Sequence, residues 1–407
     1  MSTHECITAI AQQHLPEALR HLRTLVDINS FTANAAGVDA VAARTAELFA
    51  DLGFEEEFSP CTTEGTGQHV FLRRRGRGGD PIVLVTHSDT VFPAEEEVKN
   101  DFRWDERPDE GRIYGPGVID NKGGTVLIWL ILRTLRDTSP ELFEQTHWLI
   151  ASNAAEEITG DDFAKQTAVR CDGHAKAVLV FEGGPVDERG WHIVTSRKGR
   201  STWKLSVEGK AAHAGSQHAV GINAIDALAL VLPSIAAWTS AAEERTVNLG
   251  HIEGGTVVNR VPHEAMAEWE CRAVTPAALA AADAFFSSLN GKAANGAILR
   301  AERTGHTLAW PGGSEVEALF KHWGDAAAQV QLSAIAVPRG GLSDANHLWQ
   351  LGPTLDGLGP WGGNAHCSER SADGTKLPEY LETSSLVPKT VMNVLALLTL
   401  ASEDGVH

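Results

Sequence analysis

Apolar side chains recur at helical spacing near the start of the chain. They occupy every third or fourth position between residues 15 and 26, and again between residues 38 and 52, which is the pattern of a helix with one buried face. Gly53 follows the second pattern, and glycine is common just past a helix C-terminus. The sequence therefore predicts two amphipathic helices before the first long apolar run.

Short apolar runs come next, with a helical pattern between them. The runs at 81–89, 148–152 and 177–181 are mostly apolar and turn polar at or after their last residues, which is typical of strands buried on both faces. Residues 123–135 have the length and apolar content of a helix. Buried strands that alternate with helices predict an α/β domain with helices on both faces of its sheet.

The pattern changes after residue 196. The expected elements are a strand at 201–207, a helix at 224–238, strands at 246–253 and 265–273, a helix at 276–289 and a strand at 297–303. The order β-α-β-β-α-β is that of a split βαβ unit, which is a two-layer α+β sandwich with its own core. We therefore predict that residues 197–306 form an inserted domain, and that residues 1–196 and 307–407 form one discontinuous α/β domain.

Composition and charge narrow the possible partners. Hydrophobic residues make up 43% of the chain and charged residues 21%, which is ordinary for a globular protein. The 53 acidic residues exceed the 34 basic ones and give a net charge of -19, so most of the surface would repel nucleic acid or an anionic membrane. No uninterrupted apolar run approaches the ~18 residues that a membrane span requires, and the first 30 residues lack the basic start and apolar stretch of a signal peptide. We expect no nucleic-acid partner, no membrane association and a cytoplasmic location.

Histidine and carboxylate residues gather where the predicted buried strands end. His87 and Asp89 end the first run, Glu156 and Glu157 follow the second, and Glu182 follows the third. Ligand sites in open α/β sheets lie at this edge. Imidazole and carboxylate groups together suit borderline and hard metal ions. Taken singly, each segment also fits a bland role, such as a structural histidine or an acidic turn in solvent.

Two further segments extend this set. Glycines between residues 115 and 124 bring Asp120 to the start of the predicted helix, and His366 lies late in the chain. A dinucleotide-binding loop would require glycine in place of Asp120, and a carboxylate there would repel a pyrophosphate. A glycine-rich turn with a capping aspartate remains the alternative for this segment.

Together these segments, in the order HxD, GxGxxDxKGG, EE, E and H, resemble the M20 family of metallopeptidases and amidohydrolases over essentially the whole chain. The resemblance implies a di-metal catalytic domain with a mixed central sheet, and an inserted lid and dimerisation domain. It implies that His87 and Glu182 bind one metal, that Glu157 and His366 bind the other, that Asp120 bridges the two, that Glu156 is the general base, and that Asp89 supports the His87 ring. It also implies a cis peptide bond between Asp120 and Asn121. One departure is Cys367, which stands where many members have serine after the histidine.

The inserted domain carries three further matches to the family. His213 matches a histidine that reaches the active site of the neighbouring subunit, which implies a homodimer. Asn259 matches an asparagine that helps to bind substrate. Arg272 matches an arginine that binds the substrate carboxylate, although an ordinary surface arginine at a strand end is the alternative.

The function implied is metal-dependent hydrolysis of an amide bond next to a free carboxylate, in an N-acyl amino acid or at the C-terminus of a peptide. In this scheme Glu156 takes a proton from the attacking water and His213 stabilises the developing oxyanion. Mixed nitrogen and oxygen ligands favour two Zn²⁺ ions per chain, with Co²⁺ or Mn²⁺ as alternatives. A non-catalytic metal-binding protein on the same scaffold is the remaining alternative. A serine hydrolase is excluded as an alternative, because the GxSxG pattern fails at Ala345.

Overall fold

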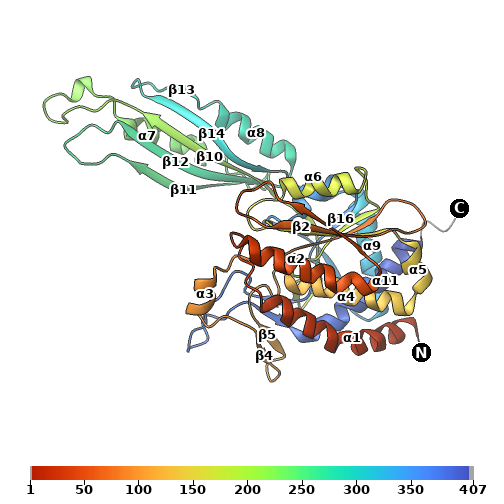
Figure 1. The fold of residues 1–407 in the computed structure, drawn as a ribbon. Coiled ribbons are helices and arrows are strands. Elements are labelled where there is room, and N and C mark those ends of the chain that lie inside the picture. The colour runs from red at the N-terminus through yellow and green to blue at the C-terminus, as the bar shows by residue number, and fades with distance from the viewer. Residues whose placement is uncertain (1, 403–407) are drawn as a thin grey trace. The chain divides into compact units, whose positions relative to one another are not determined.

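The computed structural model describes residues 2–402, and the chain divides into two compact units (Figure 1). The larger unit comprises Met1–Thr195, Gly312–Pro338 and Ser343–His407. The inserted unit comprises Ser196–Pro311 and Arg339–Leu342. Each unit has its own sheet and its own buried core.

A mixed six-stranded sheet lies at the centre of the larger unit. In spatial order its strands are β1 (Glu55–Pro60), β2 (Gln68–Arg74), β6 (Trp148–Asn153), β3 (Ile82–His87), β7 (Ala177–Val180) and β16 (Thr354–Leu355). The neighbouring strands β6, β3, β7 and β16 run parallel to one another. Strand β2 is antiparallel to both of its neighbours, β6 and β1. Every residue of β3, β6 and β7 is buried, which explains their continuous apolar sequence. The carboxyl ends of these three strands therefore share one edge of the sheet.

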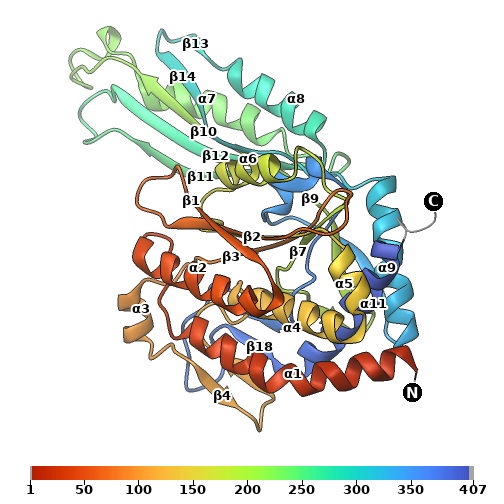
Figure 2. The same ribbon diagram turned by 45° about the vertical axis from the view of Figure 1, so that its right-hand side comes forward.

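Helices cover both faces of this sheet, as predicted. Figures 1 and 2 show α1 (Thr3–Val26), α2 (Ala35–Phe49) and α4 (Lys122–Thr138) on one side and α6 (Asp161–Arg170) on the other. The first helix begins at Thr3, well before its predicted start, and Gly53 has a φ of 77° after the short helix η1 (Ala50–Leu52). This left-handed conformation explains why glycine follows the second helical segment.

The last helical segment is apolar overall, although polar residues interrupt it. Thr383–Ser402 is long and apolar enough to cross a membrane, which a search for uninterrupted apolar runs did not detect because polar residues such as Lys389 and Asn393 interrupt it. However, 67% of its most apolar 18-residue window is buried inside the protein. Its helix α11 (Leu386–Ser402) contacts α1, α4 and α9 (Ser314–Gln329). This packing is that of a core helix.

The inserted unit has the predicted order β-α-β-β-α-β. Its main elements are β10 (Gly199–Glu208), α7 (Ala224–Ala236), β11 (Thr246–Gly254), β12 (Glu264–Ala273), α8 (Pro276–Ser287) and β14 (Ile298–Thr307), with a short additional strand β13 (Gly291–Lys292). The strands form an antiparallel sheet in the order β11-β12-β10-β14-β13. Side chains along β10 and β12 alternate between buried and partly exposed, and both strands contact the two helices. Trp203, Trp269 and Phe286 pack together in the core.

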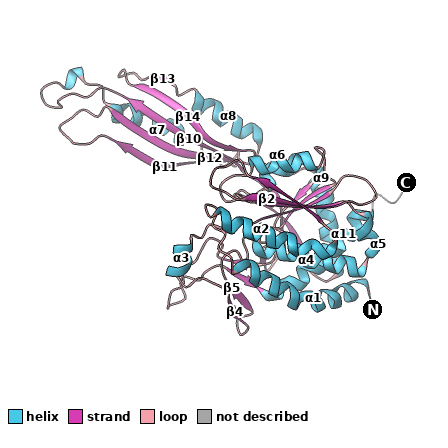
Figure 3. Cartoon of the chain, viewed as in Figure 1, coloured by secondary structure: helices cyan, strands magenta, loops and turns pink. Residues whose placement is uncertain are grey.

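Shorter elements complete the chain (Figure 3). They are α3 (Ala94–Lys99), β4 (Asp105–Arg107), β5 (Arg112–Tyr114), α5 (Pro140–Gln145), β8 (Val186–Asp187), β9 (Gly190–Arg197), η2 (His218–Val220), β15 (Ala334–Arg339), α10 (Ala345–Leu348), η3 (Trp349–Leu351), β17 (Gly362–Gly363), β18 (Tyr380–Glu382) and η4 (Thr383–Ser385). Two small sheets have the strand orders β15-β9-β8 and β17-β18-β5-β4. The second of these brings the segment before α4 close to the loop that carries His366.

Candidate metal centre

His87, the last residue of β3, forms a first group with two carboxylates. Its Nε2 atom lies 2.9 Å from Oδ1 of Asp120 and 3.7 Å from Oε1 of Glu182. Asp120 stands just before α4, and its peptide bond to Asn121 is cis, which confirms that expectation. Glu182 follows β7, so two of the three side chains come from the carboxyl ends of adjacent parallel strands.

A second group shares Asp120 with the first. His366 Nε2 lies 3.3 Å from Oδ2 of Asp120 and 3.3 Å from Oε2 of Glu157. Asp120 therefore offers one carboxylate oxygen to each of the two histidines. The ring of His366 is half-exposed and belongs to a residue with a φ of 67°. The site thus has one buried histidine and one histidine that faces solvent.

Asp89 links the His87 ring to the turn that carries Glu156 and Glu157. It is fully buried, and its Oδ1 atom lies 3.3 Å from Nδ1 of His87. Its two oxygens also accept the backbone N–H groups of Glu156 and Glu157, at 3.1 and 3.3 Å. The hydroxyl of Thr32 donates to it at 2.7 Å. One carboxylate therefore orients the histidine and fixes the start of the glutamate turn.

The carboxylates of this site lie close together, which favours a bound cation. Hydrogen bonds with Asp120 and Glu157 raise the pKa of His366 to about 10. Burial raises the pKa of Glu156 well above its ordinary value, and nearby carboxylates add to the effect. A proton on His366 would balance part of the carboxylate charge here, and a divalent ion would balance more of it. Potential ligand atoms of His87, Asp120 and Glu182, and separately of Asp120, Glu157 and His366, lie within 4.8 Å of one another. The residues present therefore fit two metal ions that share Asp120.

Two buried carboxylates near this centre were not predicted. Oε1 of Glu379 accepts the backbone N–H groups of Ile119 and Asp120 at 2.9 and 3.1 Å, and burial raises its pKa to about 8. Asp344 accepts the side-chain amide of Asn153 at 2.8 Å. Neither carboxylate ends a predicted buried strand, so the sequence offered no signal beyond their being acidic.

His213 and Asn259 lie on neighbouring segments of the inserted unit. Nδ1 of His213 accepts the backbone N–H groups of Gly215 and Ser216 at 3.1 and 3.2 Å. The proton of the neutral ring is therefore on Nε2, where it is available to an acceptor. The carbonyl of Asn259 accepts the N–H of Ala214 at 3.0 Å.

Arg272 already has partners within the inserted unit. Its Nε and Nη2 atoms donate to the two oxygens of Glu270 at 2.9 and 3.2 Å, and Nη1 donates to the carbonyl of Gly340 at 2.8 Å. A substrate carboxylate would have to share this guanidinium with Glu270 or displace it.

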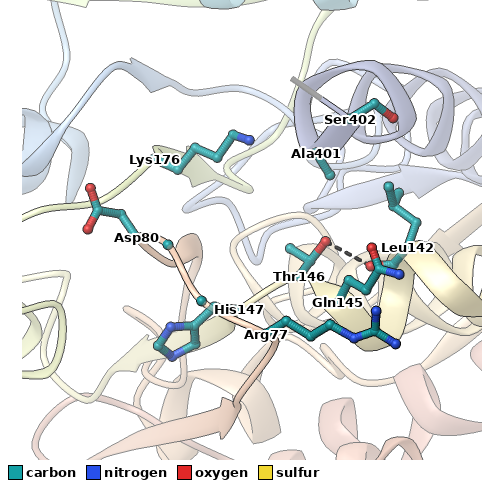
Figure 4. A pocket seen from close by; sticks show the side chains of 11 residues that line it. Arg77, Asp80, Leu142, Gln145, Thr146, His147, Lys176, Ala401 and Ser402 are labelled. Carbon is teal, nitrogen blue, oxygen red and sulfur yellow. Dashed lines mark hydrogen bonds between the residues drawn. The ribbon is translucent and has the colours of Figure 1, made fainter. Parts of the chain in front are cut away.

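A cavity of about 510 Å³ lies at the other end of the buried strands (Figure 4). Its lining includes Arg77, Asp80, His147 and Lys176, which stand just before β3, β6 and β7. None of the predicted site residues lines it. The cavity and the metal centre therefore occupy opposite edges of one sheet.

The fold and site together define an α/β protein with a candidate two-metal centre and an inserted α+β unit. Residues 195–295 match the family described as the peptidase dimerisation domain of the M20 group. The chain is 28% identical over 257 residues to carboxypeptidase G2 of Pseudomonas sp. (strain RS-16), covering 63% of this chain and 59% of that protein. It is 28% identical over 274 residues to acetylornithine deacetylase of Pectobacterium carotovorum (strain PC1), covering 61% and 66%. These alignments span less than two thirds of either relative.

Solved structures share the fold over almost the whole chain. Aminopeptidase PepT from Bacillus cereus superposes with a TM-score of 0.76 at 20% identity, covering 95% of this chain and 99% of that one. An M20 family metallo-carboxypeptidase, Sso-CP2 from Sulfolobus solfataricus, gives 0.69 at 16% identity, covering 95% and 99%. The chain therefore contains an M20 peptidase dimerisation domain and has the fold of M20 peptidases, which confirms the resemblance seen in its motifs.

Proposed function

We propose that the protein hydrolyses an amide bond next to a free carboxylate, in an N-acyl amino acid or at the C-terminus of a peptide. The observation that carries this proposal is the position of Asp120 between His87 and His366, with a glutamate beside each histidine. This arrangement suits two metal ions that share one carboxylate. The names of the sequence relatives, a carboxypeptidase and a deacetylase, support the substrate class.

The residues divide into ligands and proton carriers. One ion would be held by His87, Asp120 and Glu182, and the other by Asp120, Glu157 and His366. Such a pair activates a water molecule and polarises the carbonyl under attack. Glu156 is the carboxylate of the turn that is not needed as a ligand, so we assign it the proton transfer from water to the leaving amine. A non-catalytic metal-binding protein would have no use for this second glutamate.

We also assign roles to three residues of the inserted unit. Nε2–H of His213 is the donor that we assign to the developing oxyanion. We assign Arg272 to the substrate carboxylate, because a guanidinium binds a carboxylate through two parallel hydrogen bonds. Asn259, which lies near His213, is proposed to contact the substrate. On a chain with a net charge of -19, an anionic substrate needs such a local positive group.

We further propose Zn²⁺ as the native metal, with Co²⁺ or Mn²⁺ as substitutes, and the cytoplasm as the location. The mixed nitrogen and oxygen donors support zinc. A panel of N-acyl amino acids and dipeptides, assayed with the native, the chelated and the zinc- or cobalt-reloaded protein, tests the activity. Cleavage that is lost on chelation and restored by metal supports the proposal. Full metal occupancy without cleavage of any free acid in the panel would favour the non-catalytic alternative.

We propose a homodimer formed through the inserted unit. Large apolar side chains are exposed on α7, on the edge strand β11 and in the loop after it: Ile225, Leu230, Ile252, Val257 and Val258. Covering such side chains is a common reason for association. If His213 serves the neighbouring subunit, inactive Glu156→Gln and inactive His213→Ala chains should regain activity when they exchange subunits. No recovery after proven exchange would contradict this sharing.

A further inference from the structure

The turn that carries Glu156 and Glu157 closes with backbone hydrogen bonds from Ile158 and Thr159 to Ala155, but its first N–H groups are held by side chains. Four successive backbone N–H groups, from residue 154 to residue 157, each donate to a buried side-chain atom. Asp89 accepts two of them and Asn153 accepts one, at 3.0 Å from Ala155. The remaining acceptor, for Ala154, is Nδ1 of His69 at 3.0 Å.

His69 lies on β2, outside every motif identified in the sequence. Its side chain is buried, and its Nε2 atom lies 3.4 Å from Oδ2 of Asp162 at the start of α6. Because Nδ1 accepts a hydrogen bond from Ala154, the proton of the neutral ring is on Nε2 and points to Asp162. Burial also lowers the pKa of His69, which favours this neutral form. The ring thus connects α6 to the beginning of the glutamate turn.

A separate metal site at this place does not fit the geometry. Cys61, His69 and Asp162 could bring one ligand atom each within 4.8 Å of one another. However, a metal at Nε2 of His69 needs a lone pair there, while Nδ1 already uses its own lone pair to accept from Ala154. The ring would have to lose its last proton to satisfy both. His69 is therefore better explained as a hydrogen-bonding residue than as a ligand.

We propose that His69 is a positioning residue for the metal centre, acting through Ala154. By holding this N–H group, with Asp162 orienting its ring, His69 fixes where the turn leaves β6. The turn then presents Glu157 to His366 and Glu156 to the reacting water. This inference rests on the proposed function for the role of the two glutamates, but the hydrogen bond itself does not depend on it.

Two substitutions separate the contact with Ala154 from the contact with Asp162. In His69→Asn, the amide oxygen is as many bonds from Cβ as Nδ1 is, so it can still accept from Ala154. In His69→Gln, the amide group reaches instead to the position of Nε2, so the N–H of Ala154 loses its acceptor. Both variants remove the ring and replace it with a neutral amide, which makes them a matched pair.

The measurements are zinc affinity by chelator competition, amide hydrogen exchange at residues 154–157, and kcat and KM on the best substrate of the panel. Of the two zinc ions, we expect the one with the lower affinity to bind to His69→Gln about 10- to 100-fold less tightly than to the native protein. Changes to groups that support metal ligands have effects of this size. Its amide at Ala154 should exchange faster, and kcat should fall with little change in KM. His69→Asn should stay close to the native protein in all three.

Equal zinc affinity and equal exchange in the native protein and both variants would overturn the proposal. Equal losses of zinc affinity and kcat in His69→Asn and His69→Gln would also overturn it. Both variants lack the ring, so a merely structural role of the ring predicts the same loss in each. If the native protein binds zinc but cleaves no substrate, the proposed function fails while zinc affinity and exchange still decide on His69. If it binds no zinc, the exchange at Ala154 alone decides.

Discussion

The central sheet has a carboxyl edge and an amino edge, where its parallel strands end and begin. These two edges place similar residue types in very different surroundings. At the carboxyl edge of β3, β6 and β7, the charged groups are buried or partly buried apart from the half-exposed His366, and the carboxylates of Asp89, Asp120 and Glu157 lie next to a histidine or to backbone N–H groups. At the amino edge, Arg77 and Asp80 are exposed and line an open cavity. A cavity with charged walls therefore does not distinguish the edge that carries the candidate metal centre. What identifies it is buried charge held by named partners, because burial without such partners is costly.

The largest expected effect comes from removing the proton carrier at the carboxyl edge. Glu156→Gln keeps the shape of the turn but cannot take a proton, so we expect kcat to fall by about 10²- to 10⁴-fold with metal content unchanged. Asp80→Asn makes the same change of charge at the amino edge and should leave kcat within about twofold. Steady-state kinetics and metal analysis of both variants test this contrast. Comparable losses in the two variants would remove the distinction between the edges.

A smaller effect is expected at Arg272. Hydrogen bonds to charged groups contribute about 1.5–3 kcal/mol, so Arg272→Ala should lower kcat/KM roughly 10- to 150-fold for a free acid. The neutral amide or ester of the same substrate should be a poor substrate for the native protein and nearly indifferent to the change.

The matched control for Arg272 is Glu270→Gln, which weakens the competing partner of the guanidinium. It should keep or increase kcat/KM for the free acid. If Arg272→Ala reduces cleavage of charged and neutral substrates equally, Arg272 serves to hold Glu270 and Gly340 in place and the carboxylate role is wrong.

The last prediction concerns stability rather than catalysis, and it involves a buried cation. Lys389 on α11 donates to the carbonyl of Gly357 at 3.1 Å, and burial lowers its pKa to about 7. The unfolded chain keeps this proton up to pH ~10.4, so between these values the unfolded state binds more protons. The free energy of unfolding should therefore rise with pH across this window, by at most about 1.4 kcal/mol per pH unit from this group.

Lys389→Met should reduce that rise, whereas Arg77→Gln at the exposed amino edge should not. Denaturant unfolding of the three proteins at several pH values between 7.5 and 10 measures the difference. Parallel pH dependences for the native protein and Lys389→Met would show that Lys389 stays protonated in the fold.

The sequence predicted the buried parallel strands β3, β6 and β7 and the three polar segments at their ends for a physical reason. Strands buried on both faces must be apolar throughout, so polar residues such as His87 and Glu182 stand out where the strands end. By contrast, β1 was missed because its residues are mostly exposed and begin with three glutamates. It is held as a strand by antiparallel pairing with β2 rather than by its own pattern.

The contacts between the site residues were harder to predict than the identity of those residues. The shared position of Asp120 joins residues far apart in the chain, and only the family resemblance implied it. Glu379, Asp344 and His69 were missed because their burial is set by tertiary packing. No local pattern distinguishes them from acidic or histidine residues on the surface.

The proposed function depends on two metal ions that share Asp120 at the carboxyl edge, and these ions can be counted. Elemental analysis of the unchelated native protein should find close to two divalent ions per chain. Glu157→Gln, which removes a ligand of one ion only, should retain about one, and Glu156→Gln should retain both. A fully active preparation with one metal or none per chain, or equal metal content in the two glutamine variants, would contradict the account.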